Sequence, residues 1–317
     1  MKFGKKIIDR LRLFRNIVRS EQKCIDSIRN SNSFYASELI RYTHSMEKGL
    51  SIENPKLGFG HKKQESMLYL LDKLKDCNDK LCIEARQMAI DSLNRYLEYH
   101  KVRGFSDEMI RRIESAMTKE KHTLEVSYGG TVEINKEDLK ADIPEIEKFF
   151  NTRHSIRDFA EDDVVDEELM RALTLAQRAP SACNRQGYRV HILSKEKSKK
   201  YAKSLSGIGG FAENVNRFVM ITGKLSAYRV DEINQYIVSA SMYASYLTLT
   251  LHLYGMGSCL VQRPLIWDKN WDELRISLGI PEDEQLICLL SVGKLKDKMQ
   301  VPESHRLNPQ IMFDFKE

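Results

Sequence analysis

Hydrophobic positions in the first half of the chain recur at the three- and four-residue spacing of helices. The pattern predicts helices at 66–77, 82–100 and 106–121, the last capped by Ser106-Asp107. The stretch Ser51–Gly60 contains glycines and a proline, which predict a loop between the first helices. The Gly129-Gly130 pair predicts the turn of a small hairpin formed by residues 124–128 and 131–135.

The second half alternates between helical and strand patterns. Helices are expected at 144–151, 166–179 and 233–254, with Asp166 as the cap of the second. Strands are expected at 189–193, 218–222, 287–293 and 311–315. These elements predict an α+β fold in which helices wrap a small sheet. We divide the chain into a helical extension, residues 1–143, and an α+β part, residues 144–317.

Composition narrows the class of protein. Hydrophobic residues make up 42% and charged residues 30% of the 317 residues, a balance typical of soluble globular proteins. The longest apolar stretch, Tyr236–Leu260, is interrupted by polar residues and reads as a buried helix rather than a membrane span. The net charge of +5 permits anionic ligands but does not indicate nucleic acid binding.

Residues 1–20 carry seven basic side chains against one acid, Asp9. Ile7, Leu11, Phe14 and Val18 fall at helical spacing. Such a helix could lie on an anionic membrane surface, or it could pack its apolar stripe on the body of the protein. We favour packing on the body.

Six cysteines occur without a Cys-x-x-Cys pair or the ligand spacing of a metal site. We expect no signal peptide, and therefore reduced thiols in a cytoplasmic protein with no metal. The cysteines are Cys24, Cys77, Cys82, Cys183, Cys259 and Cys288.

Two segments at the start of the α+β part offer polar groups to a ligand. Arg153–Phe159 has two arginines and a serine that could bind a phosphate, or could be solvated. In Ala179–Gly187, Pro180 ends a helix and a polar loop follows. Asn184 and Gln186 present donors and acceptors that match the pyrimidine edge of a flavin, or they satisfy the backbone of the loop.

Two later segments are also candidates. In Tyr254–Val261, Gly255 and Gly257 let backbone approach a flat ligand, or they form a helix cap followed by a strand. The spacing is not the Gly-x-Gly-x-x-Gly of a dinucleotide fold. The strand 287–293 is followed by a lysine-rich run and by Pro302–Arg306, which could complete an anion site or form a solvated tail.

The order and spacing of these four segments resemble the FMN-dependent nitroreductase family. That family has an Arg-x-Ser-x-Arg-x-Phe segment, an Ala-Pro-Ser-x-x-Asn-x-Gln loop, a Gly-x-Gly-Ser segment after the long helix and a Leu-Gly-Ile-Pro unit near the end. All four occur here in that order, over a little more than half of the chain.

The resemblance implies which residues bind the cofactor. Those near the phosphate and ribityl end are Arg153, His154, Ser155 and Arg157, with Ser304 and Arg306 returning from the tail. Those along the isoalloxazine are Pro180, Ser181, Asn184, Gln186, Gly257, Ser258, Cys259 and Leu260. Glu303 departs from the family, because many relatives have a basic residue there.

The resemblance also implies an assembly and an activity. It implies a homodimer with FMN at the subunit interface, the long helix as the dimer core and the strand 311–315 paired with the partner's sheet. It implies an oxidoreductase that passes hydride from NAD(P)H through flavin N5 to a small-molecule acceptor. The acceptor would be a nitro compound, a quinone or a biosynthetic substrate. Similar extensions occur on family members encoded near polysaccharide enzymes, which makes a sugar-linked substrate one candidate. The alternative is a flavin carrier, sensor or assembly partner with little NAD(P)H turnover.

The helical extension departs from typical members of that family, which begin almost at the Arg-x-Ser segment. His44, Glu47 and Lys48 lie on one helical face. We favour a surface cluster with one ion pair. The alternative is a cap on the flavin pocket in which His44 and Lys48 contact substrate.

Overall fold

The computed structural model describes most of the chain. The described residues are 8, 10–11, 14–15, 18, 22–28, 31–120, 128–203, 205, 208, 210–232, 234–261 and 269–316. No helix among them is long and apolar enough to cross a membrane.

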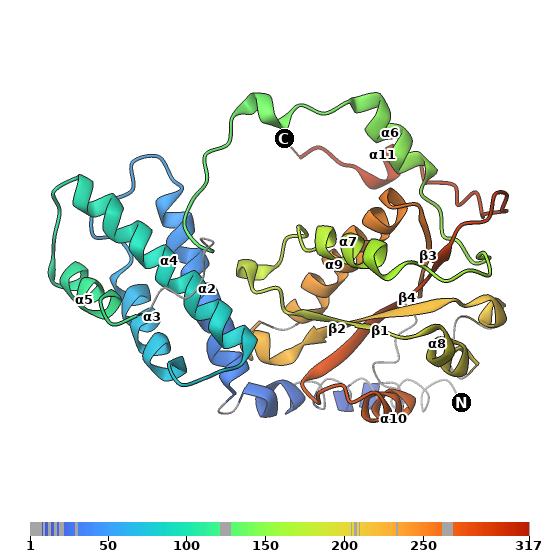
Figure 1. Ribbon diagram of the computed structural model, residues 1–317, viewed down its shortest axis with the longest axis horizontal. Helices are drawn as coiled ribbons and strands as arrows, with labels where there is room; N and C mark the ends of the chain where they lie inside the picture. Colours follow the sequence, from blue (N-terminus) through green and yellow to red (C-terminus); the bar gives the residue numbers. More distant parts are fainter. Residues whose placement is uncertain are drawn as a thin grey trace.

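The first half forms a bundle of four helices (Figure 1). These are α2 (Asn32–Leu50), α3 (His61–Leu74), α4 (Lys80–Val102) and α5 (Glu108–Met117). The side chain of Ser31 accepts from the Phe34 amide to cap α2, and Asp107 accepts from the Ile110 amide to cap α5. The expected helices are confirmed, with ends that differ by a few residues.

The core of this bundle is built only from residues between Ala36 and Ile113. At its edge, His100 is fully buried and its Nε2 accepts from the Gly58 amide at 3.0 Å. Its Nδ1 therefore carries the proton and donates to the Tyr96 carbonyl at 2.8 Å. This neutral imidazole fixes the loop Ser51–Gly60, which was expected from sequence, against α4.

The chain then leaves the bundle at residues 128–130, which are pinned to it. The Tyr128 amide donates to Asp91 at 2.6 Å and the Gly130 amide donates to Glu47 at 3.2 Å. A Cβ on Gly129 would lie 2.6 Å from the Met88 carbonyl oxygen, so only glycine fits here. The expected hairpin is wrong in its second strand, because 131–135 is irregular; 124–127 lie outside the described residues.

The following segment arches over α7 and α9 towards the sheet (Figure 1). It contains the short turn η1 (Lys136–Leu139) and α6 (Ile143–Thr152), the helix expected at 144–151. Asp142 caps α6 by accepting from the Glu145 amide, and Pro144 occupies the first turn, where its missing amide hydrogen costs nothing.

The second half contains a sheet of four strands with the order β1-β2-β4-β3, and every neighbouring pair is antiparallel. The strands are β1 (Tyr188–Ile192), β2 (Arg217–Lys224), β3 (Met256–Val261) and β4 (Glu284–Lys294). Together with its helices, the sheet confirms the α+β fold class.

Helices cover both faces of the sheet (Figure 1). Val219 and Ile221 of β2 pack under α7 (Asp166–Ala176) and α9 (Gln235–Leu253). The alternating Phe218 and Met220 pack on α8 (Lys195–Ala202) and α10 (Lys269–Ser277). The remaining turns are η2 (Ala182–Asn184), η3 (Ala212–Asn214) and η4 (Leu225–Ala227).

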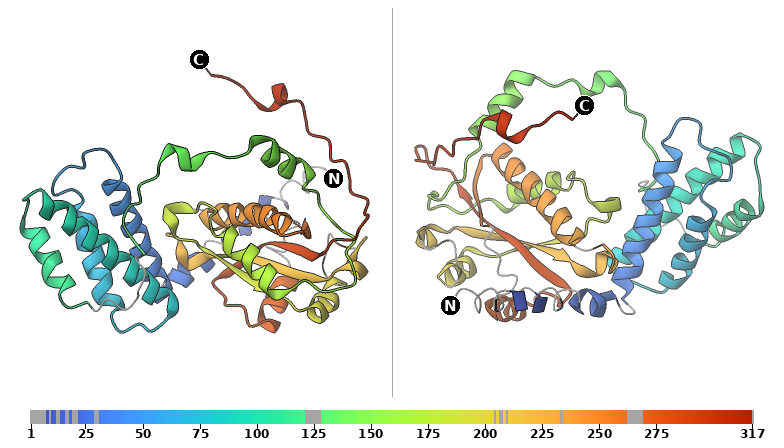
Figure 2. Two further views of the ribbon diagram at one scale, coloured as in Figure 1. Left: turned by 45° about the horizontal axis from the view of Figure 1, so that its top comes forward. Right: turned by 180° about the vertical axis from the view of Figure 1, so that it is seen from behind.

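Two expectations about helix and strand ends are wrong. Residues 311–315 do not form a strand: Pro309–Met312 is helix α11, capped by Asn308, and the tail projects away from the sheet (Figure 2). A strand needs a neighbour for its backbone groups, and this tail pairs with no strand among the described residues. Val165 is the N-cap of α7 in place of Asp166, which instead places its charge in the first turn.

The expected packing of the basic amino terminus on the body is not supported. Most of residues 1–20 lie outside the described residues, but Leu11, Phe14 and Val18 are described and are 63%, 68% and 49% exposed.

The sheet carries a buried carboxylate that makes stability depend on pH. Burial alone would raise the pKa of Glu284, but hydrogen bonds from His191 at 2.7 Å and Thr222 at 2.6 Å lower it below 4.5. The stabilisation is therefore complete above pH 4.5 and is lost as pH falls through the lowered pKa. We expect Glu284→Gln to flatten the acid limb of urea midpoints measured between neutral and acid pH. An unchanged slope would contradict this assignment.

Candidate functional site

The Arg153–Arg157 segment lies directly alongside strand β3. Ser155 and Ser258 form a parallel bridge, and the Ile156 amide donates to the Ser258 carbonyl at 2.9 Å. The side chains of Ile156 and Phe159 are buried, so the segment is fastened from both its backbone and its apolar side chains. Two of the four segments chosen from sequence are thus brought together as an added edge of the sheet.

The polar side chains of this segment are available to a ligand. Among the described residues, no carboxylate pairs with Arg153 or Arg157, whereas Arg185 and Arg217 in the same half have acidic partners. Arg157 lies near Cys259, where its charge opposes the rise that burial causes in the pKa of that thiol. Two guanidinium groups and a hydroxyl without acidic partners are the donor set that an anion requires.

Arg153 and Ser155 open into a cleft of about 710 Å³. Arg153 and Ser155 line one wall of the cleft, and α9 residues between Ile237 and Leu249 line the opposite wall. The floor is formed by Leu260, Ile287 and Cys288. Phe150 of α6 closes the end next to Arg153. The cleft therefore combines a cationic end with a long wall of mixed apolar and hydroxyl side chains, an arrangement that suits a ligand with a charged tail and a flat body.

The two glycines at the start of β3 have structural roles, one at the end of α9 and one in close packing. Gly255 has φ +69 and ends α9, which is the helix-cap reading of this segment. A Cβ on Gly257 would lie 2.8 Å from Leu295 and 3.1 Å from Ile156, so protein atoms fill that space. Gly257 thus lets the Arg153–Arg157 segment approach β3. The place of its backbone beside a ligand stays a prediction.

We expect Gly257→Ala to push Ile156 away from β3 and weaken the bridge. Overpacking of this kind costs about 1–3 kcal/mol of unfolding free energy. The change should also disturb Arg153, so a nitrogen-15 amide spectrum should show shifts concentrated at residues 153–157. Gly210→Ala is the matched control, because no atom lies within 4 Å of a Cβ there and Gly210 does not have a positive φ. Equal stability of the Gly257 variant and wild type would contradict the packing argument.

His252 is a site residue that sequence reasoning missed. It lies in the last turn of α9, where its Nε2 is 3.0 Å from the Thr152 hydroxyl and its ring lies 5.0 Å from that of Phe149. Burial, with the charges of Arg153 and His154 added, lowers its pKa below 6.5. Only the folded contact with α6 reveals this role, since no sequence spacing connects residues 152 and 252.

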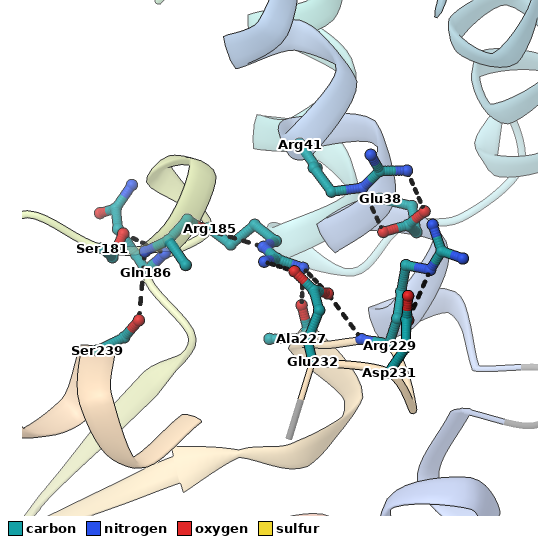
Figure 3. Close-up of polar contacts among 11 residues, drawn as sticks. Glu38, Arg41, Ser181, Arg185, Gln186, Ala227, Arg229, Asp231, Glu232 and Ser239 are labelled. Carbon is teal, nitrogen blue, oxygen red and sulfur yellow. Dashed lines mark hydrogen bonds and ion pairs between the residues drawn. The ribbon is translucent and has the colours of Figure 1, made fainter. Parts of the chain in front are cut away.

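The loop Ser181–Gln186 lies at the other end of α9. The Ala182 amide donates to the Ser239 hydroxyl at 3.3 Å, and the Gln186 amide donates to the Ser181 hydroxyl at 3.0 Å (Figure 3). Cys183, Asn184 and Gln186 all have positive φ, between 47 and 55 degrees. Three such non-glycine residues in one short loop are strained, so surrounding contacts must hold them.

Arg185 supplies those contacts, and sequence reasoning passed over it. Its fully buried guanidinium donates to both carboxylate oxygens of Glu232, at 2.7 and 2.6 Å, and to the carbonyls of Ala182 and Ala227 (Figure 3). It also lies over the Tyr228 ring at 4.5 Å. We call Arg185, Glu232 and Tyr228 the loop clamp.

The cleft connects the two ends of α9. The helical rise of about 1.5 Å per residue places Ser239, which holds the loop, about 20 Å along the axis from His252, which lies beside Arg153. The cleft follows α9 between these points. The arginine segment and β3 thus meet at the cleft, whereas the loop contacts α9 through Ser239, on the opposite side of the helix from the cleft residues Ser241 and Thr248.

Comparison with known proteins is consistent with this arrangement. Residues 151–238 match the model of the nitroreductase family. The chain is 27% identical over 172 residues to a putative NADH dehydrogenase/NAD(P)H nitroreductase of Archaeoglobus fulgidus, covering 51% of this chain and 92% of that protein. By this resemblance we call the carboxyl-terminal half of the chain the nitroreductase-family domain.

Solved structures also resemble the nitroreductase-family domain. An FMN-dependent nitroreductase from Clostridium difficile is 25% identical, with a TM-score of 0.45 over 53% of this chain and 98% of that one. The nitroreductase CinD from Lactococcus lactis, in complex with nicotinic acid, is 15% identical, with a TM-score of 0.46 over 55% of this chain and all of that one.

The tail of the nitroreductase-family domain does not reach the cleft. Ser304 and Arg306 are exposed, and Arg306 donates to the Ser304 carbonyl at 2.6 Å. Among the described residues, none that lines the cleft comes from this tail. A phosphate role for the pair therefore requires a change of position or a second copy of the chain.

The helical bundle contacts the nitroreductase-family domain through α2, which packs on both η2 and η4. Ser33 accepts from Ser226 at 3.0 Å, and the charge of Arg41 helps to lower the pKa of Glu232 against the effect of burial. In Figure 3, Glu38 and Arg41 lie beside the turn that carries Glu232. The bundle thus supports the loop clamp from behind.

The candidate substrate residues on α2 make modest contacts. His44 lies 3.4 Å from Glu47, the same carboxylate that holds Gly130, and Lys48 is exposed. The pair His44–Glu47 fits the interpretation as a surface ion pair, with Glu47 rather than Lys48 as the partner of His44. Their role towards a substrate stays a prediction.

Proposed function

We propose that this chain is an FMN-dependent oxidoreductase that takes hydride from NAD(P)H and reduces a small-molecule acceptor. The observation that carries the proposal is the bridge between Ser155 and Ser258, because it sets Arg153 at the end of a long cleft, with Arg157 two residues beyond the bridge. The family match of residues 151–238 supports an oxidoreductase role.

The residues present fit FMN. Arg153, Ser155 and Arg157, with His154 beside them, would hold the phosphate dianion by charge-assisted hydrogen bonds. The α9 wall of the cleft and the floor residue Leu260 would lie along the ring system, with Gly257, Ser258 and Cys259 of β3 behind it. When bound, FMN supplies the chemistry of accepting and releasing hydride.

The loop would hold the polar edge of the ring. Ser181, Asn184 and Gln186, which follow the exposed Pro180, are half-buried in the loop that contacts Ser239 near the start of α9. The amide side chains can present both donors and acceptors, and the loop clamp keeps them in one conformation. Positioning of this kind, rather than an acid–base pair, is the contribution of the protein.

We also propose a homodimer with the cleft at the subunit interface. Helix α9 is apolar around most of its circumference, yet Val238, Met242 and Tyr246 on one stripe are more than 40% exposed, as is Leu253. A helix that is hydrophobic all round is normally buried on all sides. Exposed apolar residues of α6 and the tail extend this surface: Ile143, Ile146, Phe150, Leu307, Ile311, Met312, Phe313 and Phe315.

The helical extension, residues 1–143, would cap the pocket from the loop end, because α2 packs on η2. In this role it would restrict which acceptors reach the flavin, and His44 with Lys48 would contact them. The free cysteines lead us to propose a cytoplasmic location. The proposed acceptor is a nitro compound, a quinone or a biosynthetic substrate.

An absorbance spectrum of the purified protein, followed by release and identification of the chromophore, tests the cofactor. About one FMN per chain is the expected result, and a colourless protein that also fails to take up added FMN would overturn the proposal. NAD(P)H oxidation with a quinone or nitroaromatic acceptor then tests turnover. Bound FMN without turnover would instead indicate a flavin carrier, sensor or assembly partner.

A further inference from the structure

The helical bundle contains a pair of cysteines far from the cleft. The Sγ atoms of Cys77 and Cys82 lie 2.8 Å apart across the turn between α3 and α4. Cys77 follows the end of α3, where its amide donates to the Leu74 carbonyl, and Cys82 lies in the first turn of α4. Local backbone hydrogen bonds therefore hold the two sulfur atoms together.

The two thiols differ in their exposure to solvent. Cys82 is 1% exposed and packs in the core of the bundle, whereas Cys77 is half-buried at its edge. Burial, followed by the contact with Cys77, raises the pKa of Cys82 to about 12, so Cys82 does not ionise readily by itself. An oxidant from solution would meet Cys77 first, and Cys82 would be the second thiol to react.

A metal site is the other chemistry that this turn could support. Asp79 places a carboxylate oxygen within 4.8 Å of both sulfur atoms. However, two thiolates on one tetrahedral zinc ion, at about 2.3 Å each, lie about 3.8 Å apart. The separation of 2.8 Å is too short for that geometry and is closer to the bond of about 2.05 Å in a disulfide.

We propose that Cys77 and Cys82 form a dithiol site that low-molecular-weight disulfides oxidise to an intramolecular disulfide. The Cys77 thiolate attacks the disulfide RSSR, forms a mixed disulfide and releases one RS⁻. The Cys82 thiol then gives up its proton, its sulfur attacks Cys77 and the second RS⁻ leaves. The balance is two protein thiols and one RSSR converted to one protein disulfide and two RSH.

The site is independent of the proposed flavin chemistry, since none of its atoms lies at the cleft. Oxidation would join the end of α3 to the start of α4 without moving either far. Cys82 contacts the carbonyl of Asn32 at 3.9 Å, the first residue of α2, so the bond would form beside the helix that supports the loop clamp.

Incubation of the full chain with glutathione disulfide tests the proposal, with an acid quench, alkylation under denaturing conditions and mass spectrometry of peptides. The expected result is a cross-linked Cys77–Cys82 peptide that has lost two hydrogens and that dithiothreitol reverses. Cys82→Ser should instead retain a glutathione adduct on Cys77, and Cys77→Ser should leave Cys82 free for alkylation. Cys183, which is also half-buried, is the internal reference for an ordinary thiol.

Two outcomes would overturn the proposal. In the first, wild-type protein keeps a stable glutathione adduct on Cys77 while Cys82 remains open to alkylation. In the second, the protein purifies with one zinc ion per chain and a chelator is needed before either cysteine reacts. Either result would be obtained whether or not the chain binds FMN.

Discussion

Arg185→Ala should lower the free energy of unfolding by about 3 kcal/mol, at the lower end of the cost of breaking a buried ion pair. The truncation removes two bonds to Glu232 and leaves that carboxylate, 25% exposed, without its main partner. It also releases a loop with three strained residues. Urea unfolding followed by fluorescence and circular dichroism measures the loss.

Two variants distinguish the stability lost with the loop clamp from the stability lost by removing a positive charge. Arg229→Ala removes a nearby ion pair in which both partners are about half exposed or more, and it should cost less than about 1 kcal/mol. Arg185→Lys keeps the charge but not the two-pronged geometry, and its stability should fall between those of wild type and Arg185→Ala. If Arg185→Ala and Arg229→Ala are equally stable, the loop clamp does not stabilise the fold as described.

The double variant Arg153→Ala/Arg157→Ala should lose FMN while remaining folded. Each hydrogen bond from a charged group contributes about 1.5–3 kcal/mol. Loss of two such bonds corresponds to at least about a 100-fold increase in Kd. Neither side chain has an acidic partner among the described residues, so the removal leaves no buried charge behind. Flavin fluorescence during titration of the apoprotein gives the affinity.

The matched control is Arg95→Ala/Arg112→Ala in the bundle. It changes the net charge by the same amount, and the two side chains are 54% and 50% exposed. It should retain FMN at the wild-type level. A double variant at positions 153 and 157 that purifies fully loaded with FMN would show that the phosphate site lies elsewhere.

Much of the fold was predictable because its elements follow local periodicity. The long α9, helices α3, α4 and α5 of the bundle and three of the four strands have clear apolar spacing and were expected close to their observed bounds, whereas no bounds were predicted for α2. The prediction of a strand in the tail was wrong for a physical reason. A β-rich sequence such as Ile311–Phe315 forms a strand only beside another strand, and Asn308 with Pro309 favours a helical turn instead. Its pairing with a partner chain stays a prediction.

The site was predictable only as a set of segments. Their order indicated the family, but the contacts that organise them join residues far apart in sequence, such as Arg185 with Glu232 and Thr152 with His252. Spacing along the chain carries no information on such pairs. Gly257 shows a further limit of sequence motifs, because its packing against Ile156 and Leu295 is visible only in the folded structure.

The core of the helical bundle has a consequence for the order of events during synthesis. Every residue of that core lies between Ala36 and Ile113, and its contacts are local, which favours rapid folding. The bundle is complete in sequence before any strand of the sheet leaves the ribosome, and domains generally fold from the amino terminus first. We therefore expect α2 to be in place as a template when the loop Ser181–Gln186 emerges. A chain ending at residue 120 that shows no helical circular dichroism would argue against this sequence of folding.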